Sequence, residues 1–144
     1  MTSRGICVVI EDDHDIRDLI DLILSSEGFD VHAFETGTEG VMAAERLNPA
    51  LITLDLGLPD MDGREAAKLV AALTPAPILM ITAFAEREDE LQGMASGAAA
   101  YLIKPFRPQQ LREAALELAP LELAPTELVP TPLASVPLAP IPLV

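Results

Sequence analysis

Residues 51–63, LITLDLGLPDMDG, run from an apolar segment into an acidic loop. The segment 51–55 is short and largely aliphatic or β-branched until its last residue, which is typical of a strand covered on both faces of a sheet. Asp55 ends this segment, and two further aspartates follow in the loop. Burying a carboxylate is costly unless it is paired. The position of Asp55 therefore raises the question of which other groups the fold brings beside it.

Similar short apolar runs recur along the chain, with amphipathic segments between them. Five strands are predicted, at 6–10, 30–34, 51–55, 78–82 and 100–103. After the first, apolar residues follow helical spacing and Gly28 stands where a helix commonly ends: Ile16, Leu19, Ile20, Ile23 and Leu24. Weaker helical patterns cover 38–47, 64–73, 87–96 and 108–118. Gly97 follows the third of these, and Pro108 suits the first turn of the last.

This alternation of strands and helices predicts an α/β fold, a (βα)5 doubly wound parallel sheet with right-handed crossovers. In the flavodoxin-like strand order 2-1-3-4-5, the first and third strands are neighbours at the topological switch point. The acids that follow the first strand, Glu11, Asp12 and Asp13, would then share a crevice with Asp55. The carboxyl edge of the sheet is therefore the predicted site.

An acidic cluster of this kind needs a positive partner. Two like charges ~4 Å apart repel by roughly 4 kcal/mol at an effective dielectric of about 20, so the cluster should bind protons or a hard cation. An all-oxygen ligand set favours Mg²⁺ over zinc. Beside such an ion Asp55 can act as a nucleophile toward phosphorus, with the Thr82 hydroxyl and the Lys104 ammonium on flanking strands meeting the remaining charge.

With these residues in place, the chain from about residue 5 to 118 resembles the receiver domain of bacterial two-component response regulators. The resemblance rests on five positions in order: an acidic pair, an aspartate in DLGLPDMDG, a hydroxyl in MITA, an aromatic residue and a lysine in KPF. In this sequence they are Glu11 with Asp12, Asp55, Thr82, Tyr101 and Lys104.

The resemblance implies a phosphorelay function. A sensor histidine kinase, a phosphotransfer protein or a small phosphodonor would phosphorylate Asp55 with Mg²⁺, and the aspartyl phosphate would later be hydrolysed. The resemblance further implies that the protein is not an enzyme in the usual sense, although it assists both of its own reactions. The implied metal ligands are Glu11, Asp12, Asp55 and the backbone carbonyl of Gly57.

The implied switch residues are Thr82, Tyr101 and Lys104, which would change a surface that binds a downstream protein. Asp13 would be accessory, and a cis peptide bond would precede Pro105. Phe84, two residues after Thr82, is large for the rim of such a pocket, and we hypothesise that it slows the entry of water.

Blander interpretations remain open at this point. Tyr101 also fits an ordinary half-buried aromatic residue, Thr82 a strand residue, and Lys104 a surface lysine. The alternative function is a pseudo-receiver or interaction module that acts unphosphorylated through its C-terminal tail.

Composition narrows the partners. Nine basic residues against 23 acidic ones give a net charge of −14, which predicts no direct contact with nucleic acid. The single Cys7 lies in an apolar run, and the N-terminal apolar stretch is too short for a signal sequence or a membrane span. These features predict a cytoplasmic protein without a membrane partner.

Composition also changes abruptly near residue 118. We expect a receiver domain over 1–118 and a Pro/Leu/Ala-rich tail over 119–144. From residue 116 the sequence follows a five-residue period with leucine always third, as in LELAP. Its prolines disfavour helix and predict an extended chain. The tail is either a linker or a segment that docks on the receiver or a partner.

Overall fold

A parallel sheet forms the centre of the computed structural model, which describes residues 3–120. Within these residues the sheet has five strands in the order β2-β1-β3-β4-β5, which confirms the predicted topology. The strands are β1 (Ile6–Ile10), β2 (Asp30–Phe34), β3 (Leu51–Leu54), β4 (Ile78–Thr82) and β5 (Ala100–Ile103). The β3 strand ends one residue earlier than predicted, so Asp55 is the first residue of the following loop.

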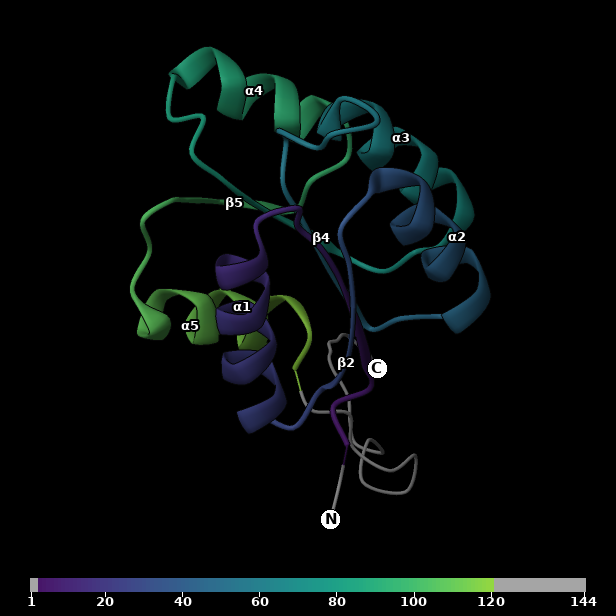
Figure 1. Cartoon of the computed structure of the whole chain (residues 1–144), viewed down its shortest axis with the longest axis vertical. Coiled ribbons are helices and arrows are strands. Elements are labelled where there is room, and N and C mark those ends of the chain that lie inside the picture. The colour runs from purple at the N-terminus through teal and green to yellow at the C-terminus, as the bar shows by residue number, and fades with distance from the viewer. Residues whose placement is uncertain (1–2, 121–144) are drawn as a thin grey trace, which may run out of the picture.

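In the same part of the chain, five helices cover the two faces of this sheet (Figure 1). They are α1 (His14–Ser26), α2 (Gly37–Leu47), α3 (Gly63–Leu73), α4 (Arg87–Ala95) and α5 (Pro108–Leu118). Helices α1 and α5 pack on one face, and α2, α3 and α4 lie on the other (Figure 1). The ends of α2 to α5 differ from the sequence-based ranges by no more than one residue, and α1 extends two residues beyond each end of its apolar pattern.

The pleat of each strand divides the core into two layers. In β1, Cys7 and Val9 face α1 and α5, whereas Val8 and Ile10 face α2 and α3. All four are 1% exposed or less. Burial raises the pKa of the Cys7 thiol, which therefore stays protonated and behaves as a small core side chain.

The predicted helix boundaries have local causes. The Asp13 carboxylate caps α1 by accepting a hydrogen bond from the Ile16 amide at 3.1 Å. Gly28 follows α1 with φ +103° and Gly97 follows α4 with φ +121°, conformations that a side chain would strain. These residues fix where α1 begins and where α1 and α4 end.

At the end of α5 the chain continues into the core rather than away from it. Ala119, which the composition assigns to the tail, is 7% exposed and packs with the α1 and α5 layer. The five-residue repeat over 121–144 lies outside the described residues. Among residues 3–120, no helix combines the length and the apolar character that crossing a membrane requires.

Candidate functional site

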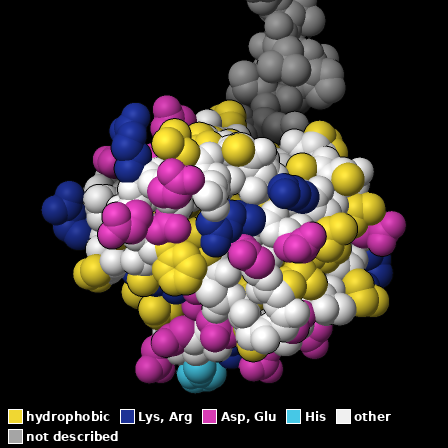
Figure 2. Space-filling view, turned by 90° about the horizontal axis from the view of Figure 1, so that it is seen from above, with side chains coloured by type: hydrophobic (Ala, Val, Ile, Leu, Met, Phe, Trp, Pro, Cys, Tyr) yellow, Lys and Arg dark blue, Asp and Glu magenta, His cyan; other side chains and the backbone are white. Residues whose placement is uncertain are grey.

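Three acidic side chains meet at the carboxyl edge of the sheet, as the strand order predicts. Because Ile10 of β1 pairs with Leu54 of β3, the next residues, Glu11 and Asp55, leave the sheet side by side. One carboxylate oxygen from each of Glu11, Asp12 and Asp55 lies within 4.8 Å of the others. Glu11 and Asp55 are buried and Asp12 is exposed. Acidic side chains also cover much of the face seen in Figure 2.

Lys104 supplies the positive charge between the two buried acids. Its Nζ lies 2.8 Å from Glu11 Oε1 and 2.9 Å from Asp55 Oδ2, and the side chain is only 12% exposed. The Lys104 amide donates to the Thr82 carbonyl at 2.8 Å, which extends the β4–β5 pairing up to the site. The peptide bond between Lys104 and Pro105 is cis, as the resemblance implies.

The charges in this cluster give Asp55 and Glu11 different protonation behaviour. Burial opposes ionisation of Asp55, but the hydrogen bond and charge of Lys104 outweigh it and lower the Asp55 pKa, helped by the Gly57 amide and the Thr82 hydroxyl. Burial raises the pKa of Glu11 to about 7, and the Asp55 charge adds to this shift. Asp55 is therefore the carboxyl group of the pair that is ionised at neutral pH.

The donor set fits a hard cation. In the described part of the chain Glu11 Oε1 receives no directed hydrogen bond, although the Lys104 ammonium lies 2.8 Å away. The Gly57 amide donates to Asp55 Oδ1 at 3.2 Å, so the turn after β3 is already folded against the acid. A Cβ at Gly57 would meet only Phe84 Cζ, at 3.8 Å. The space beside Gly57 is therefore open except on the Phe84 side.

Asp13 lies apart from the three-acid cluster. Its carboxylate caps α1, and its amide donates to Glu11 Oε2 at 3.1 Å. Arg17 donates to the Glu11 carbonyl at 3.0 Å from the first turn of the same helix. These contacts orient the Glu11 side chain and the loop that carries it.

Thr82 and Tyr101 are joined through Phe84. The Thr82 hydroxyl is buried and accepts a hydrogen bond from the Phe84 amide at 3.3 Å. The Tyr101 hydroxyl donates to the Phe84 carbonyl at 2.8 Å. Burial raises the pKa of Tyr101, and the nearby Asp89 charge adds to this, so its hydroxyl remains a donor. The two predicted switch residues thus hold opposite sides of one loop residue.

The sequence did not reveal how the loop after Asp55 is held. Asp60 accepts hydrogen bonds from the Gly37 amide at 2.8 Å, and from the Thr38 amide and hydroxyl at 2.9 and 2.6 Å. These donors, with the Thr38 hydroxyl first, lower the Asp60 pKa to about 2. The same loop also requires a glycine at position 63, since a Cβ there would lie 2.4 Å from the Asp55 carbonyl oxygen. The Pro-Asp pair signals a turn, but nothing local identifies α2 as its partner.

Comparison with known proteins defines the class. The family model described as response regulator receiver domain matches residues 7–116. The chain therefore belongs to the response regulator receiver domain family and to two-component signalling.

Curated relatives agree with this assignment. The DNA-binding response regulator MtrA of Mycobacterium tuberculosis is 36% identical over 110 residues, which are 76% of this chain and 48% of MtrA. The transcriptional regulatory protein SrrA of Staphylococcus aureus is 36% identical over 104 residues, which are 72% of this chain and 43% of SrrA. The chain thus spans about half the length of the curated relatives it matches.

Solved structures confirm the fold. A CheY-like receiver domain protein from Methanospirillum hungatei JF-1 superposes with a TM-score of 0.75 at 31% identity, covering 81% of this chain and 93% of that one. Chemotaxis protein CheY4 of Vibrio cholerae gives a TM-score of 0.74 at 27% identity, with 82% and 99% covered.

The prediction of no direct nucleic-acid contact is wrong. The match to this chain covers 48% of MtrA, which is named a DNA-binding response regulator. The charge argument failed because a DNA-contacting surface needs only a local basic patch. The net charge of a whole sequence does not report on such a local surface.

Proposed function

We propose that this receiver accepts a phosphoryl group on Asp55 from a sensor histidine kinase or phosphotransfer protein. The observation that carries the proposal is the Lys104 ammonium, 2.9 Å from a buried Asp55 carboxylate beside two further acids. An exposed lysine or a simple helix cap would not produce this arrangement. The interpretation of Thr82, Tyr101 and Lys104 as ordinary structural residues accounts for each position but not for their convergence.

In the proposed reaction an Asp55 carboxylate oxygen attacks phosphorus. The new bond is the P–O bond of the aspartyl phosphate, and the bond that breaks joins phosphorus to the donor's imidazole nitrogen, which keeps the electron pair. Lys104 stays protonated and stabilises the charge on the phosphoryl oxygens. Mg²⁺ held by Glu11, Asp12, Asp55 and the Gly57 carbonyl would screen the carboxylate from those oxygens.

Phosphorylation would then change the hydrogen bonds of Phe84. A phosphoryl oxygen on Asp55 offers the Thr82 hydroxyl a charged acceptor, which draws it away from the Phe84 amide. The Phe84 carbonyl, which holds the Tyr101 hydroxyl, shifts with the same residue. The chemistry at Asp55 thereby reaches the surface around Tyr101, where a downstream partner reads it. Because the matched relatives include DNA-binding regulators, control of DNA binding is the class of output we propose.

Intact mass after incubation with Mg²⁺ and a small acyl phosphate tests this function. We expect one phosphoryl adduct on the unchanged protein and on Asp62→Asn, a matched acidic residue of the same loop that caps α3. We expect no adduct on Asp55→Asn or in excess chelator. An adduct that persists on Asp55→Asn, or a folded protein that neither the acyl phosphate nor a histidine kinase phosphorylates, would contradict the proposal.

A further inference from the structure

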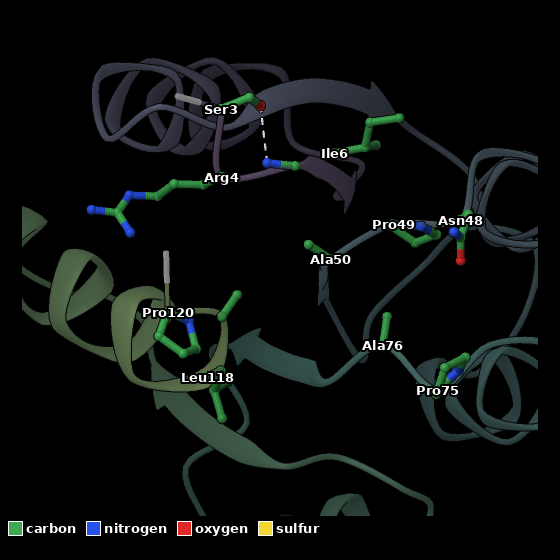
Figure 3. Close-up of a pocket in the computed structure, with 12 residues that line it drawn as sticks. Ser3, Arg4, Ile6, Asn48, Pro49, Ala50, Pro75, Ala76, Leu118 and Pro120 are labelled. Carbon is green, nitrogen blue, oxygen red and sulfur yellow. Dashed lines mark hydrogen bonds between the residues drawn. The ribbon is translucent and has the colours of Figure 1, made fainter. Parts of the chain in front are cut away.

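The amino edge of the sheet carries a groove of about 520 Å³ that the proposed phosphotransfer does not use. Its walls are the segments that lead into β1, β3 and β4 together with the end of α5. Ala50, Ala76 and Pro120 surround the opening from different sides, as Figure 3 shows. Since Asp55 lies at the other end of β3, an occupant of this groove would not touch the phosphorylation site.

The lining is mostly small and apolar. Pro49 is buried, while Ala50 and Ala76 are half-buried and Pro75 is exposed. Among the described residues that line the groove, Arg4 is the only charged one, and its Nε donates to the Glu27 carbonyl at 2.6 Å. The groove therefore offers an apolar floor with one fixed positive side chain.

The end of the described chain forms part of the groove wall. Leu118 is half-buried and packs against the α1 and α5 layer, and the next residue, Ala119, is 7% exposed. Both line the groove together with Pro120 (Figure 3). The described part of the chain therefore ends at the groove wall, and the sequence continues with LELAPTELVPTPLASVPLAPIPLV over residues 121–144.

We propose that residues 121–144 dock in the amino-edge groove of their own receiver. Their leucine, valine, alanine and proline side chains match its apolar lining, and burying them contributes roughly 25 cal/mol for each Å² of apolar surface. Their only charged side chains are Glu122 and Glu127, whose sign complements Arg4. One five-residue repeat in extended form spans roughly 15 Å, so the segment has the reach to fold back across the groove.

Covalent attachment is the reason to assign the segment to its own receiver rather than to a second copy. A short tether gives an effective concentration in the mM range, which exceeds ordinary protein concentrations. The tail therefore binds the groove of its own molecule at protein concentrations too low for it to bind the groove of a second molecule. This inference does not depend on phosphorylation of Asp55.

Hydrogen exchange of the full chain, followed by mass spectrometry, tests the proposal. The informative amides are those of Ala50 and Ala76, which follow the groove prolines. The tail variant carries Leu123→Ser, Leu128→Ser, Leu133→Ser and Leu138→Ser, outside the described fold. The groove variant is Pro75→Glu, and its matched control is Ala72→Glu, which adds the same charge at an exposed position of α3 outside the groove.

We expect the two amides to exchange about five-fold more slowly in the unchanged protein and the control than in either variant, as a docking free energy near 1 kcal/mol would give. Combining the two variants should add nothing further, and the difference should not depend on protein concentration. Equal exchange rates in the unchanged protein and the tail variant would overturn the proposal. Protection that grows with concentration, together with a dimer in light scattering, would also overturn it and assign the groove to a second copy.

Discussion

The two edges of the sheet differ in chemistry although the same strands supply both. At the carboxyl edge, Glu11, Asp55 and Lys104 bring three ionisable groups into direct contact. At the amino edge, Ala50 and Ala76 leave an apolar groove. The loops at the two ends of a parallel sheet can therefore acquire different functions independently. Each strand fixes the position of its two ends but not the side chains that follow.

The strongest way to break the charged edge is Lys104→Met. Losing the ammonium leaves the Asp55 phosphoryl oxygens without their fixed counter-charge, so we expect the phosphorylation rate to fall roughly 100-fold or more. Intact mass over time measures the rate. Lys68→Met is the matched control, since Lys68 is exposed on α3 and lies away from the acidic cluster. Similar rates in the two variants would remove Lys104 from the proposed chemistry.

The pH dependence of stability sharpens the same comparison. Glu11 has a pKa of about 7 in the folded protein against an ordinary value of 4.5, so between these values the folded state holds a proton that the unfolded state has lost. In chelator the free energy of unfolding should therefore fall by about 1 to 3 kcal/mol as pH rises through this window.

Denaturant unfolding between pH 5 and 8 measures this effect. Glu11→Gln should flatten the slope, and saturating Mg²⁺ should reduce it by favouring the ionised carboxylate. The lowered pKa of Asp55 affects a different pH range, because its contribution to the free energy of unfolding is lost only as pH falls below about 4. If the free energy of unfolding fell equally with pH in the unchanged protein and in Glu11→Gln, Glu11 would not be the group that causes the pH dependence.

Phe84→Ala tests the rim of the site. Phe84 lies beside Gly57 and is 42% exposed, so its loss should open the path of water to the aspartyl phosphate. We expect a few-fold faster dephosphorylation, measured by decay of the phosphoryl adduct after the donor is removed. Leu91→Ala, an exposed apolar position on α4, serves as the control. An unchanged decay rate would discard the role of Phe84.

Asp60 should have the smallest effect because it acts through the loop backbone. Asp60→Ala removes all three acceptor contacts to the start of α2, whereas Asp60→Asn keeps one carbonyl oxygen. We expect a lower Tm and slower phosphorylation, both larger for alanine than for asparagine. The Asp60 contribution to Tm should also disappear as pH falls from about 4 toward its pKa of about 2. If the two variants had the same Tm and the same phosphorylation rate, the hydrogen bonds of Asp60 to the start of α2 would not position the site.

The success of the sequence-based predictions follows the range of the interactions involved. The ranges predicted for the five strands and for α2 to α5 were accurate to a residue, because apolar periodicity and end signals such as Gly97 depend on near neighbours. The nucleic-acid prediction failed because it summed charge over the chain, whereas DNA binding depends on a local surface. The tail prediction stays open, since residues 121–144 lie outside the described structure.

The amino-acid sequence was enough to predict the fold class, the flavodoxin-like strand order and the candidate residues at the carboxyl ends of the strands. Only the tertiary structure decided that one ammonium contacts both Glu11 and Asp55, that Phe84 links Thr82 to Tyr101, and that Asp60 holds α2. The physical reason is distance along the chain. Periodicity and caps depend on near neighbours, whereas these contacts join groups brought together only when the sheet and its helices have packed.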